Sequence, residues 1–210
     1  MQANALQFGP GRRAATDKRQ EILDVAASFF LSYGYAGSSV SAMARHSGIS
    51  KESFYRYFDS KAGLFKAVID QELEQYKRKI RRLTEHWDEE DLRESLVKVA
   101  ETLLSVLMRD RQRALRRLVF NQMQRAPEIG RHYYRIGPKL AYDNLERFFA
   151  LHASESRFEP QFLSRAFVAL VLHELMLELN CGVRGEPDTE EISALAVPIV
   201  DHFLEAYFPA

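Results

Sequence analysis

Cysteine is almost absent from this 210-residue sequence, in which Cys181 is the sole example. No disulfide can therefore form within the chain, and such low usage is typical of proteins in a reducing compartment. Cys181 lies in an apolar run beside Gly182, without a basic neighbour that would activate it. We therefore predict a buried, structural thiol.

Long uninterrupted apolar runs are missing as well. The most apolar stretch, residues 162–183, is interrupted by Arg165, His173, Glu174 and Glu178, so it is a poor candidate for a membrane span. The first residues contain no basic segment leading into a long apolar run, which argues against a signal peptide. We expect a cytoplasmic protein with no membrane partner.

The patterns typical of enzymes are also lacking. The six histidines are dispersed, and His173-Glu174 does not continue as H-E-x-x-H because Leu177 occupies the last position. No glycine-rich phosphate loop occurs. We predict no catalytic residue, no metal and no cofactor, and an all-α enzyme would require a cluster of titratable groups that the sequence does not supply.

Apolar residues recur at every third or fourth position, and no stretch alternates long enough to predict a β-strand, which indicates an all-α fold of about nine helices. A first helix is expected from near Asp17, with Gln20 completing a capping box, to Gly34. Two short helices follow within residues 38–58. The remaining helices are expected over residues 60–84, 91–109, 111–125, 127–151 (interrupted at Gly137-Pro138), 159–181 and 188–207, with Pro127, Pro160 and Pro187 at helix starts and an acidic N-terminal turn at 88–91.

The net charge of zero conceals an uneven division. Residues 1–61 contain eight Lys or Arg against five Asp or Glu, which leaves 21 against 24 in the rest of the chain. A small basic head on an acidic body is typical of DNA-binding proteins. A random scatter of surface charges would explain so small a difference equally well.

Residues 38–61, SSVSAMARHSGISKESFYRYFDSK, predict a helix-turn-helix. Ser38 or Ser39 can cap the first helix, and Gly48 can adopt the positive φ of a tight turn. Ser50 can cap the second helix, in which Phe54 and Phe58 lie one turn apart on a face that should be buried. The opposite face should then enter a DNA major groove.

The same stretch resembles the N-terminal signature of TetR/AcrR-type transcriptional regulators, through the pattern S-x-x-x-M-A-x-x-S-G-I-S-K-x-x-F-Y-x-Y-F-x-S-K-x-x-L-F. Glu52 departs from the small or neutral residue usual in the family, and Arg56 stands at a variable position. Both should affect which operator is read. The resemblance is strong over residues 17–70 and looser beyond, where residues 116–148 and the ending IVDHFLEAYFPA are similar to body helices of the family.

The resemblance places a set of polar residues on the DNA. The positions expected to meet the phosphate backbone are Ser50, Lys51, Ser53, Tyr55, Tyr57 and Lys61, whose charges and hydroxyls suit phosphate oxygens. Ser39 is a further residue expected to bind DNA. Arg45, Glu52 and Arg56 are candidates for reading bases, since arginine forks onto guanine and glutamate accepts from cytosine. An intrahelical ion pair between Glu52 and Arg56 is an alternative of equal weight.

Tight operator binding requires two heads, on half-sites roughly 34–36 Å or a multiple of that distance apart. In the family, the last two long helices form a four-helix homodimer interface, and both are strongly apolar here. Burial of both helices in the core of a single chain is the alternative. The residues that we predict at the interface are Phe167, Leu170, Leu175, Leu195, Ile199 and Phe203, and Pro198 should kink the last helix.

Family precedent places an effector pocket among the central helices. Aromatic walls with a few polar groups suit a small, mostly apolar ligand. The residues predicted to line the pocket are Trp87, Phe120, Asn121, Met123, Gln124, Tyr133, Tyr134, Tyr142 and His173, with Glu174 nearby.

These expectations combine into one hypothesis. Residues 1–15 would form a mobile tail, 16–62 a DNA-binding domain, and 63–210 a domain that binds the effector and dimerises. The protein would be a homodimeric repressor that is released from operator DNA when a small effector binds. The alternative is a DNA-binding regulator whose C-terminal body only dimerises and holds no ligand.

Overall fold

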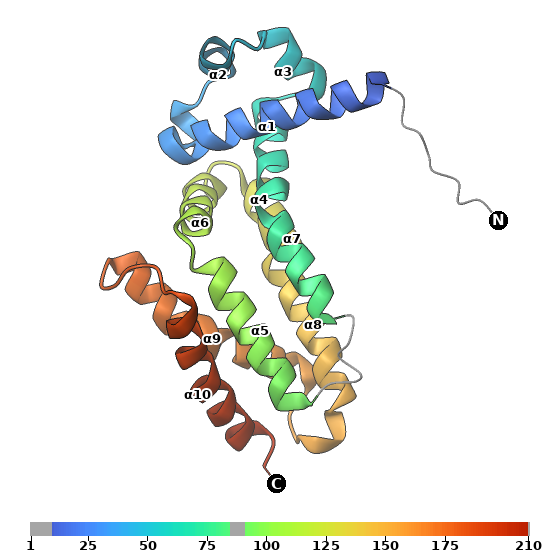
Figure 1. Ribbon diagram of the computed structural model, residues 1–210, viewed down its shortest axis with the longest axis vertical. Coiled ribbons are helices and arrows are strands. Elements are labelled where there is room, and N and C mark those ends of the chain that lie inside the picture. The colour runs from blue at the N-terminus through green and yellow to red at the C-terminus, as the bar shows by residue number, and fades with distance from the viewer. Residues whose placement is uncertain (1–9, 85–90, 210) are drawn as a thin grey trace, which may run out of the picture. The chain divides into compact units, whose positions relative to one another are not determined.

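The computed structural model describes residues 10–84 and 91–209, and over these ranges it contains ten α-helices, one short 3-10 helix and no strand (Figure 1). The all-α prediction is confirmed, and the tenth helix arises because Gly137-Pro138 divides the predicted helix over residues 127–151. The bounds are α1 Pro10–Gly37, α2 Val40–Ser47, α3 Lys51–Tyr57, α4 Lys61–Thr84, α5 Leu92–Leu107, α6 Asp110–Met123, α7 Pro127–Ile136, α8 Pro138–Leu151, η1 Ala153–Glu155, α9 Pro160–Cys181 and α10 Thr189–Tyr207.

The chain divides into two compact units after Gln71, within α4. The first unit, which we call the head, contains α1, α2, α3 and the first part of α4. The second unit, which we call the body, contains the remainder of α4 and helices α5 to α10. The sequence placed this boundary earlier, after residue 62.

Helix α1 begins at Pro10 and not near Asp17. Gln20 makes no capping box with Asp17, because its side chain donates to Asp24 Oδ1 over 2.9 Å along the same helix. The first nine residues of the predicted mobile tail, 1–9, lie outside the described part of the chain.

The sequence predicted that the first helix ends at Gly34; α1 continues to Gly37 but is kinked at Gly34. Its backbone has φ 71° and ψ 171°, a conformation that essentially only glycine adopts. The buried Ser38 hydroxyl then donates to the carbonyl oxygens of Phe29 (2.9 Å) and Gly34 (2.7 Å). This hydrogen bonding fixes the bend between α1 and α2.

The core of the head is built on aromatic contacts between α1 and α4. The rings of Phe30 and Phe65 meet edge to face, with centroids 4.9 Å apart, and Tyr35 packs on both rings. Phe54 and Phe58 from the helix-turn-helix are buried. Phe29 of α1 is only half-buried, and its ring contacts Tyr33 and His46.

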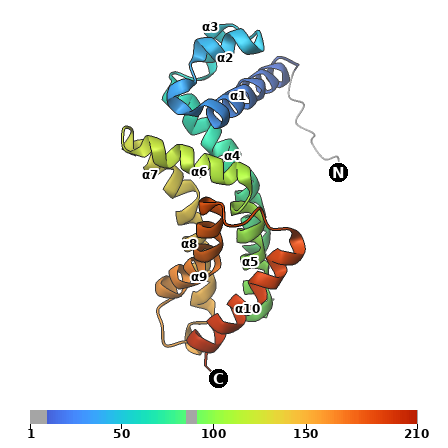
Figure 2. The same cartoon turned by 90° about the vertical axis from the view of Figure 1, so that its left-hand side faces the viewer.

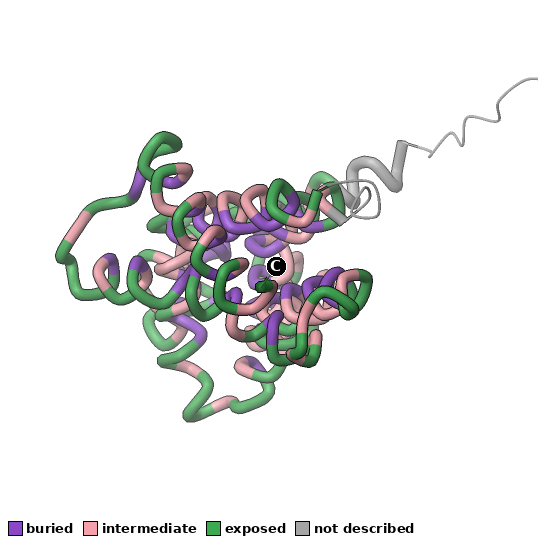
Figure 3. Tube along the Cα trace, turned by 90° about the horizontal axis from the view of Figure 1, so that it is seen from below, coloured by how far each residue is buried: buried purple, intermediate pink, exposed green. Residues whose placement is uncertain are grey.

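In the body, α8 packs against α9, α10 against α5, and α6 against α7 (Figures 1 and 2). Its core is aromatic where α8, α9 and α10 meet: Phe203 lies 5.7 Å from Phe149 and 5.1 Å from Phe167, measured between ring centroids. Buried and exposed residues alternate along the helices, as amphipathic helices require (Figure 3).

The helix ends in the body follow local chemistry. Pro127 and Pro160 begin α7 and α9 as predicted, and Pro138 begins α8. Pro187 precedes α10, whose N-cap is Asp188 in a capping box with Glu191. Asp91 caps α5 through the backbone N–H of Glu94, whereas residues 88–90 of the predicted acidic turn lie outside the described residues.

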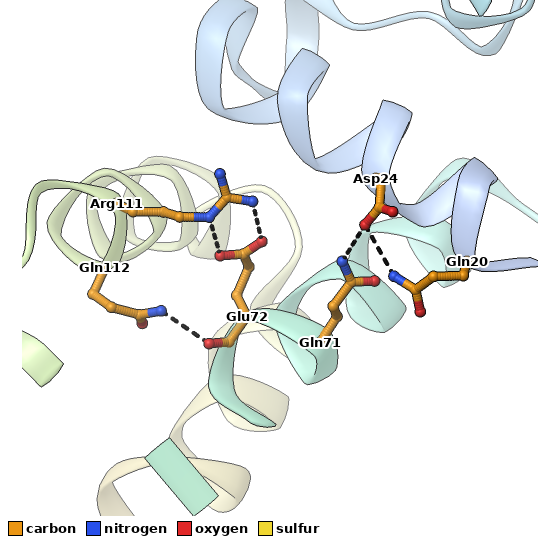
Figure 4. A network of polar contacts seen from close by, with 6 residues as sticks. All are labelled: Gln20, Asp24, Gln71, Glu72, Arg111 and Gln112. Carbon is orange, nitrogen blue, oxygen red and sulfur yellow. Dashed lines mark hydrogen bonds and ion pairs between the residues drawn. The ribbon is translucent and has the colours of Figure 1, made fainter. Parts of the chain in front are cut away.

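Two neighbouring residues of α4 make side-chain contacts within their own units (Figure 4). In the head, Gln71 Nε2 donates to Asp24 Oδ1 of α1 over 2.7 Å. In the body, the Glu72 carboxylate accepts from Arg111 Nε and Nη2 of α6, both over 2.7 Å. Gln112 Nε2 donates to the Glu72 carbonyl oxygen over 2.9 Å.

Candidate functional site

The helix-turn-helix of the head is defined by two side-chain caps and one glycine. Ser39 Oγ accepts from the Ala42 N–H (3.1 Å) at the start of α2, and Ser50 Oγ accepts from the Ser53 N–H (3.2 Å) at the start of α3. Between them, Gly48 has φ 68° and ends α2 in the left-handed conformation. The caps and the turn that the sequence predicted are confirmed.

The orientation of α3 follows from one buried ring. Phe54 is 1% exposed, which directs this face of the helix into the core of the head. The opposite face is therefore turned outward: Lys51, Glu52 and Arg56 are exposed, and Tyr55 is 46% exposed. A short helix thus displays cations and a phenol hydroxyl to solvent.

The cations beside α3 lie over aromatic rings. Lys51 Nζ is 5.9 Å from the ring centroid of Tyr55, and Arg56 Cζ is 5.3 Å from that of Tyr57. Lys61 Nζ is 4.3 Å from the Tyr35 ring, and partial burial lowers the pKa of Lys61. These ring contacts restrain long side chains at the surface without neutralising their charge.

The alternative role for Glu52 is not realised here. Among the described residues it forms no ion pair with Arg56, whose guanidinium lies over Tyr57 instead. Both charged groups remain available on the exposed face. An arginine and a glutamate displayed in this way can read guanine and cytosine in a major groove.

A cavity of about 450 Å³ lies in the body, among α4, α5, α6, α7, α8 and α9. This volume falls within the range of small-molecule sites. Of the predicted pocket residues, Phe120, Met123, Tyr133, Tyr134 and Tyr142 line the cavity. The other lining residues are Leu73, Tyr76, Leu103, Leu107, Arg116, Val119, Gly130, Gly137, Pro138, Ala141, Val168, Leu172 and Met176.

Three residues that were predicted to line the pocket lie elsewhere in the body. Asn121, Gln124 and His173 are exposed and do not line the cavity. Asn121 and His173 stand on the outer sides of α6 and α9, and Gln124 follows the end of α6. Trp87 lies outside the described residues.

Arg116 was not predicted from the sequence, and it is the only charged group among the described residues that line the cavity. Its Nη2 donates to the Leu107 carbonyl oxygen and its Nη1 to Met176 Sδ, both over 2.8 Å. Its spacing from Val119, Phe120 and Met123 was the available signal, since positions three, four and seven apart share one helix face.

Burial changes the titration of three cavity groups. The pKa of Arg116 is lowered, mainly because the side chain is buried. The nearby charges of Arg113 and Arg117 lower this pKa further, whereas Tyr133 raises it. Burial raises the pKa values of Tyr76 and Tyr133, and Tyr142 contributes to the rise at Tyr76. Both phenols are therefore protonated and can donate hydrogen bonds at neutral pH.

The predicted dimer residues divide into inner and outer sets. Phe167 and Phe203 are fully buried within the body, and Leu175 is 6% exposed, so these three pack in the core of the single chain. Leu170 is 50% exposed, and Leu195 and Ile199 are half-buried. With Leu175 and Phe203 they line a groove of about 530 Å³ formed mainly by α9 and α10.

Cys181 is exposed at the end of α9, so the prediction of a buried thiol was wrong. The apolar run that motivated it ends one residue later, where Gly182 adopts φ 72° and terminates the helix. A residue in the last turn of a helix escapes the packing that its sequence neighbours undergo.

A capped helix-turn-helix with an outward-facing second helix, joined to a larger helical body, defines a DNA-binding transcriptional regulator. Residues 22–68 match the family model described as "Bacterial regulatory proteins, tetR family", and residues 94–209 match "AefR-like transcriptional repressor, C-terminal domain". The chain belongs to the TetR family of transcriptional regulators.

Known proteins of similar sequence or structure support this assignment to the TetR family. A TetR-family regulator structure from Mesorhizobium loti MAFF303099 superimposes with a TM-score of 0.79 at 26% identity, covering 92% of this chain and 98% of that one. The flavonoid-responsive regulator FrrA gives 0.76 at 28% identity, with the same coverage. The uncharacterised regulator YfiR of Bacillus subtilis is 33% identical over 99 residues, which are 43% of this chain and 48% of YfiR.

No helix in residues 10–84 or 91–209 is both long enough and apolar enough to cross a membrane.

Proposed function

We propose that the protein is a homodimeric repressor whose affinity for operator DNA falls when a small, mostly apolar effector occupies the body cavity. The observation that carries this proposal is the cavity of about 450 Å³ in the body of a chain whose head displays a DNA-reading helix. Two comparisons support it: the matched C-terminal model is named for a repressor, and FrrA is a flavonoid-responsive regulator.

On the DNA side, the roles follow from chemistry and exposure. Ser39, Ser50, Lys51, Ser53, Tyr55, Tyr57 and Lys61 would contact phosphates and position α3. Arg45, Glu52 and Arg56 would contact base edges and thereby set the operator sequence.

Replacing Lys51 by alanine tests the phosphate contacts. A dimer then loses two contacts, so the slope of log affinity against log salt should fall by about 1.8, at about 0.9 per contact. The duplex would first be selected from random DNA with the wild-type protein, and affinity measured by fluorescence anisotropy. Lys139→Ala, an equal change of charge on an exposed site of α8, should leave the slope unchanged. Equal slopes for Lys51→Ala and wild type would contradict the assignment.

Homodimerisation would use the outer residues of α9 and α10. A second copy is the expected occupant of the apolar groove there, because TetR-family regulators typically dimerise. Leu170→Glu should shift the sedimentation of the protein towards monomer and abolish tight operator binding. Leu151→Glu, on a similarly exposed leucine of α8, is the matched control. Unchanged sedimentation of Leu170→Glu would place the interface elsewhere.

Helix α4 provides a physical route for coupling. It is one continuous helix whose residues Leu64 and Phe65 belong to the core of the head, while Leu73 and Tyr76 line the cavity. A ligand that favours another position of Tyr76 would shift the helix as a rod. By linkage, operator DNA must then weaken effector binding by the same factor.

The effector is tested by a thermal-shift screen of lipophilic compounds, followed by operator affinity in the presence of each hit. Hits should weaken operator binding of the wild type. Ala141→Leu, which adds volume at a buried cavity residue, should abolish the response, whereas Ala150→Leu on the exposed side of the same helix should not. Stabilising hits that leave operator affinity unchanged would refute the coupling, whereas a screen without any hit would favour the alternative, in which the body only dimerises and holds no ligand.

A further inference from the structure

The body cavity contains a single charged group and no counter-charge. Of its described lining residues, Arg116 alone is ionised at neutral pH, and none is Asp, Glu, Lys or His. The rest of the wall is aliphatic or aromatic. Any ligand that fills the cavity must therefore accommodate one guanidinium in apolar surroundings.

Arg116 makes no ion pair with any residue that the structure describes. A guanidinium has five N–H donors, whereas Arg116 makes two hydrogen bonds, one to the Leu107 carbonyl oxygen and one to the thioether sulfur of Met176. A thioether is a weak acceptor. The nearest acidic group on the same helix, Asp110, is paired with Arg113.

The surroundings of Arg116 do not relieve its charge. Its flanking cations Arg113 and Arg117 add positive potential. A partly buried cation without a partner is costly unless an anion neutralises it. No described residue that lines the cavity therefore neutralises the positive charge of Arg116.

The wall of the cavity also contains protonated phenol hydroxyls. Tyr76 is 2% exposed, and its hydroxyl makes no hydrogen bond with any described residue. The hydroxyl of Tyr133 likewise makes no hydrogen bond with a described residue. Tyr76, Tyr133, Tyr142 and Arg116 all line this one cavity. Together they offer a guanidinium fork and unused hydroxyl donors, which suits an acceptor with two oxygen atoms.

We infer that the effector is an amphipathic carboxylate, whose single negative head pairs with Arg116 while its apolar body fills the remaining cavity. This inference rests on the proposed function and names the chemistry of its ligand. A neutral ligand would leave Arg116 desolvated and unpaired, and an amine would be repelled. A polyanion would bring more charge than one arginine can neutralise.

Matched acids and amides test the inference: decanoate against decanamide, and 2-naphthoate against 2-naphthamide, each titrated into the full chain by calorimetry. Each acid should bind roughly 10- to 100-fold more tightly than its amide, because a hydrogen bond to a charged group is stronger than a neutral one. Arg116→Met should abolish this preference by weakening only the acids. Arg117→Met, the same change at the exposed neighbouring position, should preserve it.

A second measurement needs no ligand. If Arg116 awaits an anion, Arg116→Met should unfold at the same Tm as wild type or higher, because a buried unpaired charge is replaced by an apolar side chain of similar length. A Tm several degrees lower would assign Arg116 a purely structural role. Any one of three results would overturn the inference: such a lower Tm, equal binding of acids and amides, or failure of every acid to bind.

The two proposals fail separately. A neutral compound that releases operator DNA through the cavity would retain the proposed function and refute the carboxylate. An acid whose binding depends on Arg116 but leaves operator affinity unchanged would retain the assignment of the site and refute the regulation.

Discussion

Replacing Arg111 by methionine should destabilise the body by about 2 kcal/mol, because it removes the ion-pair partner of a buried carboxylate. The Glu72 side chain is 5% exposed, whereas that of Arg111 is 58% exposed. Breaking a fully buried pair costs about 3–5 kcal/mol. Because the Arg111 side chain is partly in solvent, water screens the ion pair, and the expected loss of stability is smaller. Figure 4 shows the pair.

The unequal exposure predicts unequal effects of the two single changes. Glu72→Met should cost about 0–1 kcal/mol, because the exposed Arg111 guanidinium stays solvated. The double variant should lie within about 1 kcal/mol of wild type, since apolar side chains can replace a buried ion pair.

Urea unfolding followed by far-ultraviolet circular dichroism measures these differences. The chain concentration is held constant because the stability of the proposed dimer would depend on it. Arg117→Met, another exposed arginine of α6, should change stability by less than about 0.5 kcal/mol. A loss below about 0.5 kcal/mol for Arg111→Met, or a double variant less stable than either single one, would refute the reasoning.

Four further substitutions test the backbone and the caps by the same unfolding measurement. Gly34→Ala should cost about 2–3 kcal/mol and Gly48→Ala about 1 kcal/mol, because only the first forces alanine into a region reserved for glycine; equal losses would contradict this. Gly130→Ala should cost about 1–2 kcal/mol, because the added Cβ would lie 2.9 Å from Met123 Cβ. This cost should outweigh the better helix propensity of alanine. A gain in stability would show that α6 and α7 can separate freely. Ser50→Ala should cost about 1 kcal/mol through the lost cap of α3, and a loss near zero would mean that water replaces it.

The helix-turn-helix was predictable from sequence because its determinants are local. Ser39, Gly48 and Ser50 act on backbone groups within three residues, and Phe54 and Phe58 mark one face by spacing alone. Such signals do not depend on distant parts of the chain. The bounds of the body helices were likewise close to those predicted, since proline and capping aspartates mark their starts.

Which residues of the body face a cavity or a partner could not be read in the same way. Helix α9 is apolar nearly all round, so periodicity could not separate the buried Phe167 from the exposed Leu170. His173 was assigned to the pocket for its chemistry, yet its position on α9 points it to solvent. Arg116 was overlooked because charged residues are usually exposed. These assignments depend on how helices pack together.

The division of labour within α3 has an evolutionary consequence. Phe54 anchors this seven-residue helix in the core, while Glu52 and Arg56 are exposed and contribute little to folding. Substitutions at these two positions can therefore accumulate without a loss of stability that selection would remove. A duplicated copy of the gene could acquire a new operator through one or two such changes while its scaffold stays intact.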